Sequence, residues 1–389
     1  MPRFPRSALS AQSLSDRVFG QLVQRAGSGP RSTRVHPLHV GDTYLEPLDL
    51  ARAEAQLTAG RERLHNYSPV QGEPELLAAI RNKVQRRSGV TLQTEHIQVM
   101  AGATGALGVI ANSLLEPGDE VIIPSPFWPL IRGVVRARGA VAVEVPLFTR
   151  LDEPSFDPVA AIEAAITERT CAIYLNSPHN PTGRTLPESA LDGIADLAEK
   201  HALWVFADEV YEDVWFGAQA PASVWARPRL AARSVATHSV SKAYGLAGAR
   251  VGYTHGPASA MEVIRGVQTF YSYCAPRPMQ FGAAAALEHG DAWLTNMREV
   301  YARAGRAAAR ALEIPEPQGG TFLFADMRRF MRPSETIGQL LERCLDAGVM
   351  LTPGTACGSA FDTWARLCFT SVPEADLHDA LDRLRGALF

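Results

Sequence analysis

Short apolar runs that alternate with helical patterns constrain the fold of this chain more than any other feature. From about residue 73, the runs HIQVM, EVIIPSP, TCAIYLNSP and LWVFADEVY are separated by helical segments such as PELLAAIRNKVQRRSG and PESALDGIADLAEKHA. Strands that are apolar along their whole length are buried on both faces, and an intervening helix is the usual crossover between parallel strands. The pattern continues through RSVATHSVS and RVGYTHG, and it predicts an α/β fold with a mainly parallel sheet covered by helices.

The composition and the hydrophobic pattern of the sequence change on both sides of this alternating region. After about residue 290 an Ala/Arg-rich helical stretch is followed by the strand-like segments GGTFLFADM and ARLCFTSV and by further helical segments, which predicts a smaller α+β unit. Residues 1 to about 40 are rich in Pro, Ser, Arg and Gly, with one short amphipathic piece from Leu14 to Val23, and this composition is typical of an arm. We expect an N-terminal arm with part of the small domain (1–45), a large domain (46–285) and a small C-terminal domain (286–389).

The charge and the cysteine content exclude several classes of function. The formal net charge of −3 leaves no electrostatic footprint for nucleic acid or for an anionic membrane surface. The five cysteines form no CxxC pair and no metal-like spacing, which predicts reduced thiols and no metal site. The N-terminus has no apolar signal-peptide core, and no segment reaches ~18 consecutive apolar residues. We therefore expect a cytoplasmic protein that binds small molecules, with neither nucleic acid nor membrane as a partner.

Several motifs follow the apolar strands directly. In open α/β sheets, ligands bind beyond the carboxyl ends of the strands, so these positions are the first candidates for a site. In AGATGAL, residues 101–107, backbone N–H groups and the hydroxyl of Thr104 can bind an anion at the start of a helix. Trp128, in the segment PFW, can stack on a planar ligand. Each motif also has a simpler interpretation, as turn chemistry or as a core aromatic residue.

The next two strand ends carry groups that suit a substituted, cationic ring. Asn180, in NSPHNPTGR, presents an amide that can donate a hydrogen bond to a ring substituent. Asp208, in ADEVY, ends a buried strand, and a buried carboxylate is costly without a cationic partner such as a protonated ring nitrogen. Tyr211 lies close behind and can bind an oxygen on the same ring. The simpler interpretation of Asp208 is a cap of the following turn.

The segment HSVSKAYGLAGARVGY, residues 238–253, adds a lysine and a phosphate-binding arginine. Ser239 and Ser241 precede Lys242, and Arg250 offers a planar fork that suits a phosphate. An amine that is partly desolvated beside an arginine favours its neutral form, which can make a Schiff base. A phosphate, a flat ring with a protonated nitrogen and an oxygen, and an aldehyde together describe pyridoxal 5′-phosphate (PLP).

The same residues resemble those of a known family. The pattern S-x-S-K followed by G-x-R-x-G, at residues 239–242 and 248–252, is similar to that of class I and II aminotransferases of PLP fold type I. The resemblance covers roughly residues 35–385. It implies a large PLP-binding domain with a mainly parallel, seven-stranded sheet covered by helices, and a smaller α+β domain.

The resemblance also implies roles for the cofactor-site residues. Lys242 would be the internal-aldimine lysine and the base that moves the proton between the substrate Cα and the cofactor C4′. Asp208 would be the partner of the pyridine nitrogen, which keeps the ring cationic. The ring hydroxyl would be held by Asn180 and Tyr211, and the ring would stack on Trp128. The remaining cofactor-binding residues would be Ala103, Thr104, Ser239, Ser241 and Arg250.

Further matches concern the substrate and a second subunit. NYSPVQGEPELLAAI, residues 66–80, is similar to the family segment whose tyrosine, here Tyr67, reaches a cofactor phosphate in the neighbouring subunit; this implies a homodimer with a shared active site. WARLCFTSV, residues 364–372, is similar to the strand whose arginine, here Arg366, binds the substrate α-carboxylate, and Gly41 would approach the substrate together with Asn180. The segment GDTYLEP departs from the family pattern, so Tyr44 is a candidate for the substrate pocket. Arg277 is a candidate for a second carboxylate site or faces solvent.

The resemblance implies an aminotransferase that works through a pyridoxamine phosphate intermediate, passing the amino group of an L-amino acid to a 2-oxo acid. The cofactor residues do not separate this reaction from lyase, decarboxylase, cyclase or oxidase chemistry on the same scaffold, in amino acid metabolism or biosynthesis. A PLP-binding regulatory protein is a further alternative, although residues 1–40 contain no helix-turn-helix pattern or basic cluster. A nucleotide-dependent dehydrogenase is disfavoured because its GxGxxG fingerprint is missing.

Overall fold

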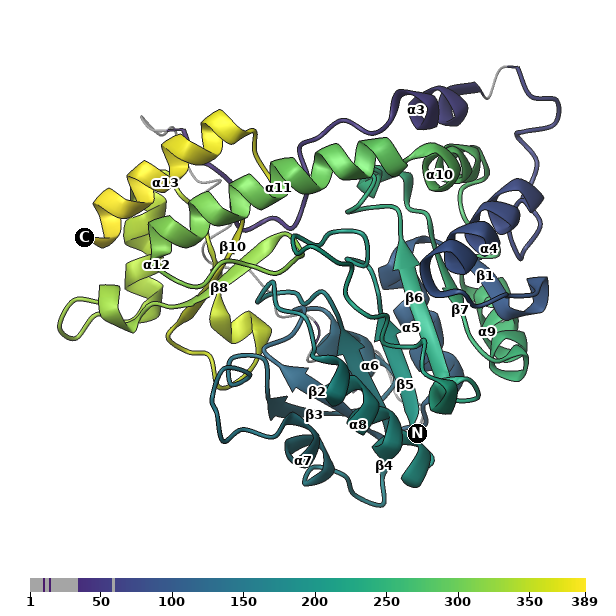
Figure 1. Cartoon of the computed structure of the whole chain (residues 1–389), viewed down its shortest axis with the longest axis horizontal. Coiled ribbons are helices and arrows are strands. Elements are labelled where there is room, and N and C mark those ends of the chain that lie inside the picture. Colours follow the sequence, from purple (N-terminus) through teal and green to yellow (C-terminus); the bar gives the residue numbers. More distant parts are fainter. Residues whose placement is uncertain (1–9, 11–13, 15–33, 58–59) are drawn as a thin grey trace, which may run out of the picture.

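A seven-stranded sheet forms the larger part of the molecule in the computed structural model, which describes residues 10, 14, 34–57 and 60–389 (Figure 1). Apart from Leu14, the amphipathic piece expected near the N-terminus lies outside the described residues. The strands are, in spatial order, β1 (Ile97–Met100), β7 (Gly252–His255), β6 (Ser234–Ser239), β5 (Trp204–Asp208), β4 (Thr170–Asn176), β2 (Glu120–Ser125) and β3 (Val141–Pro146). Strand β7 is antiparallel to both neighbours, and the other six strands share one direction. The predicted mainly parallel sheet is confirmed.

Helices cover both faces of this sheet because alternate residues of its central strands point to opposite sides. In β4, Ile173 belongs to one hydrophobic core and Tyr174 to the other. The core around Tyr174 is closed by α5, α6 and α9, and the core around Ile173 by helices that include α4, α8 and α10. The helices of this part are α3 (Asp49–Gln56), α4 (Pro74–Ser88), α5 (Gly102–Leu114), α6 (Ile131–Ala137), α7 (Pro158–Glu163), α8 (Glu188–Lys200), α9 (Ala258–Tyr271) and α10 (Arg277–His289), with the 3₁₀ turns η2 (Thr94–His96), η3 (Pro228–Leu230) and η4 (Ala247–Ala249).

A second, three-stranded sheet confirms the expected smaller α+β unit. It is antiparallel, in the order β8 (Phe322–Asp326), β10 (Trp364–Cys368) and β9 (Thr352–Pro353). Figure 1 shows α11 running from α10, beside the large sheet, to α12 and α13 beside the small sheet. The remaining elements are α11 (Asp291–Leu312), α12 (Ile337–Asp346), α13 (Glu374–Leu388) and the 3₁₀ turns η5 (Arg328–Phe330) and η6 (Gly354–Cys357).

The chain before α3 joins this smaller unit. His36 forms a parallel bridge with Val349, and the carbonyl oxygen of Leu38 accepts a hydrogen bond of 2.7 Å from the backbone N–H of Cys368. Because Leu38 and Gly41 are only three residues apart, this pairing fixes where Gly41 lies relative to β10.

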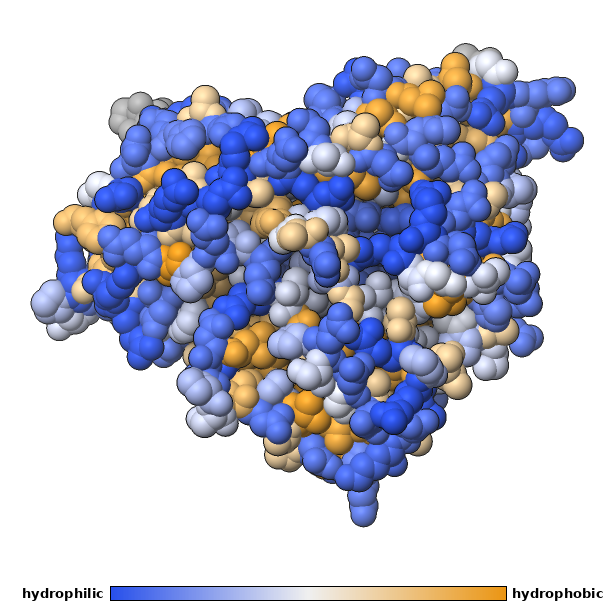
Figure 2. Space-filling view, in the orientation of Figure 1, coloured by the Kyte–Doolittle hydropathy of each residue, from blue (hydrophilic) through white to orange (hydrophobic). Residues whose placement is uncertain are grey.

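The surface in Figure 2 is mainly hydrophilic, with hydrophobic residues gathered over α3. Leu50 and Leu57, in and directly after that helix, are exposed. Within the described residues, no helix combines the length and the apolar character needed to cross a membrane.

Candidate active site

A cavity of about 380 Å³ opens at the carboxyl ends of the central parallel strands. Asn176, Asp208 and Ser239, which line it, are the last residues of β4, β5 and β6. Gly41 and residues of the small sheet form the opposite wall. The sequence-predicted site residues that line this cavity are Gly41, Ala103, Thr104, Trp128, Asn180, Asp208, Tyr211, Ser239, Ser241, Lys242, Arg250 and Arg366.

Lys242 lies in the turn after β6 and reaches across the cavity. Its Nζ donates a hydrogen bond to the carbonyl oxygen of Gly41. Burial lowers the pKa of the Lys242 amine; Asp42 opposes this effect, while Arg250 and Arg366 add to it. The amine is therefore held in surroundings that favour its neutral, nucleophilic form.

Asp208 places a buried carboxylate at the end of β5. It is 4% exposed, and its Oδ2 accepts a hydrogen bond of 2.6 Å from the hydroxyl of Tyr174. Burial raises the pKa of Asp208 to about 6, against the hydrogen bond from Tyr174, which lowers it. A cationic group in the cavity would compensate this buried charge.

Asn180 and Tyr211 lie together on the same side of the cavity. The Nδ2 atom of Asn180 donates a hydrogen bond of 3.3 Å to the Tyr211 hydroxyl, and the backbone N–H of Asn180 donates to Asn176 Oδ1 at 2.8 Å. Asn176 in turn donates from Nδ2 to the carbonyl oxygen of Asp208 at 2.9 Å. These bonds tie the NPTG segment to the ends of β4 and β5, so an amide and a phenol face one region of the cavity.

Arg250, Ser239 and Ser241 meet at the first turn of α5. The backbone N–H of Ser241 and its hydroxyl both contact Ser239 Oγ, at 3.0 and 2.8 Å. Gly102, the first residue of α5, has a φ of +77°, and a Cβ there would overlap the Arg250 guanidinium. Glycine thus permits the guanidinium to lie against a helix N-terminus, where two hydroxyls, a cation and free backbone N–H groups suit a phosphate.

Arg366, on β10, is 4% exposed and points into the cavity wall. Its Nη1 donates to Asn180 Oδ1 at 3.1 Å, and its Nη2 donates to the carbonyl oxygen of His39 at 3.2 Å and to Thr352 Oγ1 at 3.3 Å. The guanidinium carbon lies 4.3 Å from the centroid of the Phe322 ring. Arg366 Nε is buried and has no hydrogen-bond partner among the described residues. The guanidinium is held in one orientation and retains donor capacity for a carboxylate.

Three residues singled out by the sequence lie outside the cavity lining. Tyr67 is 80% exposed and packs against Tyr273, with ring centroids 5.0 Å apart. Tyr44 does not enter the pocket: its N–H donates to Thr370, and its side chain packs on the main core. Arg277 is paired with the buried carboxylate of Glu73, with an Nε to Oε1 distance of 2.7 Å, so it does not simply face solvent.

Other lining residues were not identified from the sequence. Asn176 carries a detectable signal, because it is a polar residue at the end of an apolar strand. Val40, Leu107 and Phe322 are apolar and give no chemical signal, and Phe322 contacts Gly41 so closely that a Cβ at residue 41 would lie 2.6 Å from its Cζ. Across residues 34–57 and 60–389, no group of three or more His, Cys, Asp or Glu side chains is arranged to hold a metal ion.

Comparison with known proteins agrees with this geometry. The family model of class I and II aminotransferases matches residues 34–384. The chain is 34% identical to an arginine–pyruvate transaminase of Pseudomonas aeruginosa, over 82% of each chain, and 32% identical to a probable aspartate/prephenate aminotransferase of Thermus aquaticus, over 85% of this chain and 86% of that protein. Among solved structures, the aspartate aminotransferase of Thermus thermophilus with maleate has a TM-score of 0.89 at 26% identity, covering 99% of this chain and 100% of that one. The Rhizobium meliloti aspartate aminotransferase has a TM-score of 0.91 at 26% identity, covering 98% of each.

Proposed function

This chain belongs to the class I and II aminotransferases, and we propose that the cavity at the ends of β4, β5 and β6 is its active site. The protein is a PLP-dependent transferase that moves an amino group between an amino acid and a 2-oxo acid. One observation carries the assignment of the site: a half-buried amine from Lys242, a buried carboxylate from Asp208 and a buried guanidinium from Arg366 line one cavity.

The residues of the cavity fit PLP. Asp208 is buried and would gain a cationic partner from a protonated ring nitrogen. A hydroxyl pair and Arg250 at the N-terminus of α5 suit the phosphate. Asn180 and Tyr211 would hold the ring oxygen, and Trp128 lines the cavity as a stacking partner. When bound, PLP supplies an aldehyde for the amino group and an electron sink for the bond that breaks at the substrate Cα.

Lys242 and Arg366 have different roles towards the substrate. Arg366 binds the α-carboxylate with its planar fork, since three hydrogen bonds already hold its Nη atoms in place and Nε has no partner in the part of the chain that the structure describes. Lys242 Nζ takes the proton from the substrate Cα, because burial favours its neutral form. Fixing the carboxylate fixes the orientation of the Cα–H bond, which selects the bond that breaks.

We further propose that the amino donor has an uncharged side chain. The charged residues that line the cavity within the described chain are Asp208, Lys242, Arg250 and Arg366, and each has a partner in the cofactor or in the α-carboxylate. His39 adds no charge at neutral pH, because burial and then Arg366 lower its pKa to about 4. The cavity is also lined by several apolar side chains, those of Val40, Leu107, Trp128, Pro129, Leu130 and Phe322.

A single-turnover experiment tests the reaction. The purified protein, loaded with PLP and mixed with one L-amino acid in the absence of any 2-oxo acid, should release one equivalent of the corresponding 2-oxo acid per site and then stop. Adding a second 2-oxo acid should restore the original visible spectrum. Continued consumption of amino acid without an acceptor would instead indicate lyase or oxidase chemistry.

A substrate panel tests the side-chain class. We expect kcat/KM for leucine, methionine and phenylalanine to exceed the values for aspartate and arginine by at least about tenfold, because a charge in an apolar pocket is left without a partner. Equal or faster turnover of aspartate or arginine would contradict the proposed side-chain class and leave the transamination assignment intact.

We also propose a homodimer in the reducing environment of the cytoplasm. Tyr67, Phe270, Tyr271 and Tyr273 form an exposed aromatic surface that a second subunit would cover. All five cysteines are free thiols, which suits a reducing compartment.

A further inference from the structure

The carboxylate of Asp208 accepts a hydrogen bond from a side chain that does not line the cavity. Its Oδ2 accepts a hydrogen bond of 2.6 Å from Tyr174, and its Oδ1 accepts a longer bond of 3.3 Å from the backbone N–H of Val210. Among the described residues, Tyr174 is the one side chain that hydrogen-bonds this carboxylate. Tyr174 does not line the cavity.

The sheet register explains this contact. Asn176 pairs with Asp208 across the parallel strands β4 and β5, so Tyr174 lies one pleat earlier on the neighbouring strand. Its ring is buried in the core with α5, α6 and α9, and is 2% exposed. A buried hydroxyl needs a partner, and here the partner is the carboxylate that reaches the cavity. The ring thus links the packed core to one oxygen of Asp208.

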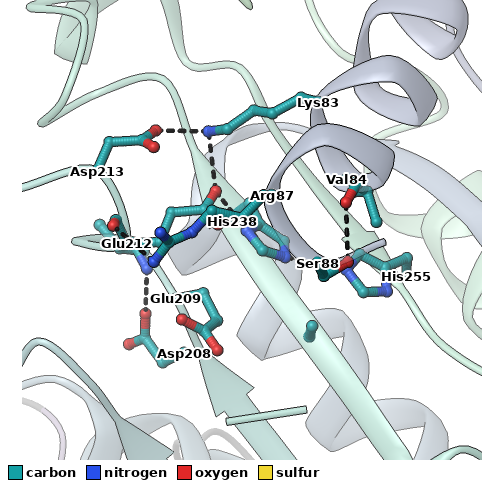
Figure 3. A network of polar contacts seen from close by, with 12 residues as sticks. Lys83, Val84, Arg87, Ser88, Asp208, Glu209, Glu212, Asp213, His238 and His255 are labelled. Carbon is teal, nitrogen blue, oxygen red and sulfur yellow. Dashed lines mark hydrogen bonds and ion pairs between the residues drawn. The ribbon is translucent and has the colours of Figure 1, made fainter. Parts of the chain in front are cut away.

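The other titratable groups around Asp208 do not hydrogen-bond its side chain. Glu209 and Tyr211 follow it in the chain, and His238 faces it from β6. Figure 3 shows Asp208 and Glu209 on one side of this region and His238 on the other. These groups act on Asp208 through space, whereas Tyr174 donates a hydrogen bond directly to the carboxylate.

His238 is itself held by a separate network. Its Nδ1 lies 2.9 Å from Glu212 Oε1, and its Nε2 lies 3.0 Å from His255 Nε2. Glu212 is also paired with Lys83, at 2.8 Å (Figure 3). Because these partners occupy both nitrogens of the His238 ring, Tyr174 remains the contact that can orient Asp208.

We propose that Tyr174 is a positioning residue that orients the Asp208 carboxylate and keeps it ionised as the partner of the cofactor ring nitrogen. This inference rests on the proposed function of the cavity. A phenol that donates to a carboxylate stabilises the ionised form, and the effect is strong because the bond is charge-assisted and shielded from water. In agreement with this stabilisation, the hydrogen bond from Tyr174 lowers the pKa of Asp208, whereas burial raises it.

The experiment compares Tyr174→Phe with the wild type, both loaded with PLP labelled with ¹⁵N in the ring. The substitution removes one hydroxyl and preserves the ring. We expect the ¹⁵N chemical shift to move towards that of the neutral ring. We also expect kcat to fall about tenfold with KM nearly unchanged, the factor that corresponds to a change of one pKa unit in the pair formed by Asp208 and the ring nitrogen. The acid limb of the pH profile of kcat should move to higher pH, because the ionised form of Asp208 loses its donor.

Controls separate this role from a general effect on packing. Tyr301→Phe removes the hydroxyl of another fully buried tyrosine, in α11, and should leave the ¹⁵N shift unchanged. In an Asp208→Asn background, Tyr174→Phe should have no further effect on the ¹⁵N shift. If Tyr174→Phe folds poorly, 3,5-difluorotyrosine at position 174 provides a stronger donor of similar shape and should move the shift towards the protonated ring.

The outcomes distinguish the two proposals. An unchanged ¹⁵N shift and an unchanged kcat in Tyr174→Phe, or an unchanged shift with difluorotyrosine, would overturn the positioning role while the wild type still transaminates. A wild-type protein that does not bind PLP in this cavity would overturn the proposed site itself.

Discussion

At the scale of single residues, the buried Lys83 and the half-buried Lys242 have opposite electrostatic surroundings. Burial lowers the pKa of both, but Lys242 stays below the ordinary value, whereas the carboxylates of Asp213 and Glu212 raise the pKa of Lys83 well above it. A lysine that remains charged can pair but cannot act as a nucleophile or base. This contrast supports the catalytic role proposed for Lys242, whereas Lys83 remains charged in its ion pairs.

Lys242→Ala should abolish transamination and leave the fold intact. The variant lacks the amine that we propose takes the Cα proton, and it lacks the group to which borohydride reduction would fix the cofactor. Mass spectrometry after reduction and a single-turnover assay measure the two losses, and circular dichroism checks the fold. Substantial 2-oxo acid formation by the variant would exclude Lys242 as the base.

Arg366→Lys should impair the amino acid more than the cofactor. Lysine keeps the charge but loses the planar fork held by Asn180 and Thr352. We expect KM for the amino acid to rise by about tenfold to hundredfold, the range for loss of a hydrogen bond to a charged group, with little change in PLP affinity. A titration with PLP and steady-state kinetics separate the two quantities, and an unchanged KM would place the α-carboxylate elsewhere.

At the scale of secondary structure elements, α4 is joined to the segment after β5 by a buried ion pair. Lys83, in α4, lies 2.8 Å from Glu212 and also contacts Asp213 (Figure 3). Burial raises the pKa of Glu212, but Lys83 and His238 lower it well below the ordinary value, so the carboxylate is charged. The helix and the segment that carries Tyr211 are thus held by opposite charges shielded from water.

Lys83→Ala should destabilise the protein by about 3–5 kcal/mol, because it leaves buried carboxylates without a cation. In the variant, burial without Lys83 should raise the folded-state pKa of Glu212 above its unfolded value. The penalty is therefore largest at high pH and decreases as the pH falls through that raised value. Urea unfolding at pH 5.5 and pH 8 measures both effects. Lys200→Ala, which removes an exposed pair with Glu163, should be nearly neutral at either pH.

The length and burial of each helix and strand determine whether it could be predicted from the sequence. Fully apolar strands such as β2 and β5 were identified, whereas β3 was not, because it is an edge strand whose residues are mostly half-buried or exposed. The six-residue helix α7 is too short for a clear period. Short or half-exposed elements depend on tertiary contacts that the local pattern does not contain.

The same limit applies to the candidate site. Polar residues at strand ends, such as Asp208, carried a recognisable signal, and Arg366 was proposed through the family resemblance. Tyr174 gave none, since a tyrosine within an apolar strand is indistinguishable from a core residue until its hydroxyl is placed beside a carboxylate. The partner of Arg277 was also hidden, because Glu73 lies about 200 positions earlier in the chain.

At the scale of the whole molecule, the proposed homodimer would cover the exposed aromatic surface formed by Tyr67, Phe270, Tyr271 and Tyr273. Tyr67 and Phe270 are 80% and 91% exposed, which is unusual for large rings clustered on one surface. Within its own chain, Tyr67 does not line the cavity. If Tyr67 contacts a cofactor phosphate, it does so in a second subunit, and the active site is complete only in the dimer.

Subunit complementation tests this arrangement. Lys242→Ala and Tyr67→Ala subunits, co-expressed with different tags and purified as heterodimers, should regain one site with wild-type PLP affinity, formed by Lys242 of one subunit and Tyr67 of the other. Heterodimers of wild type with the double variant carrying both substitutions should not regain it, because the intact lysine then faces the altered tyrosine. Activity at limiting PLP and light scattering measure affinity and assembly. The reverse result, with recovery only in the second heterodimer, would mean that Tyr67 serves the site of its own subunit.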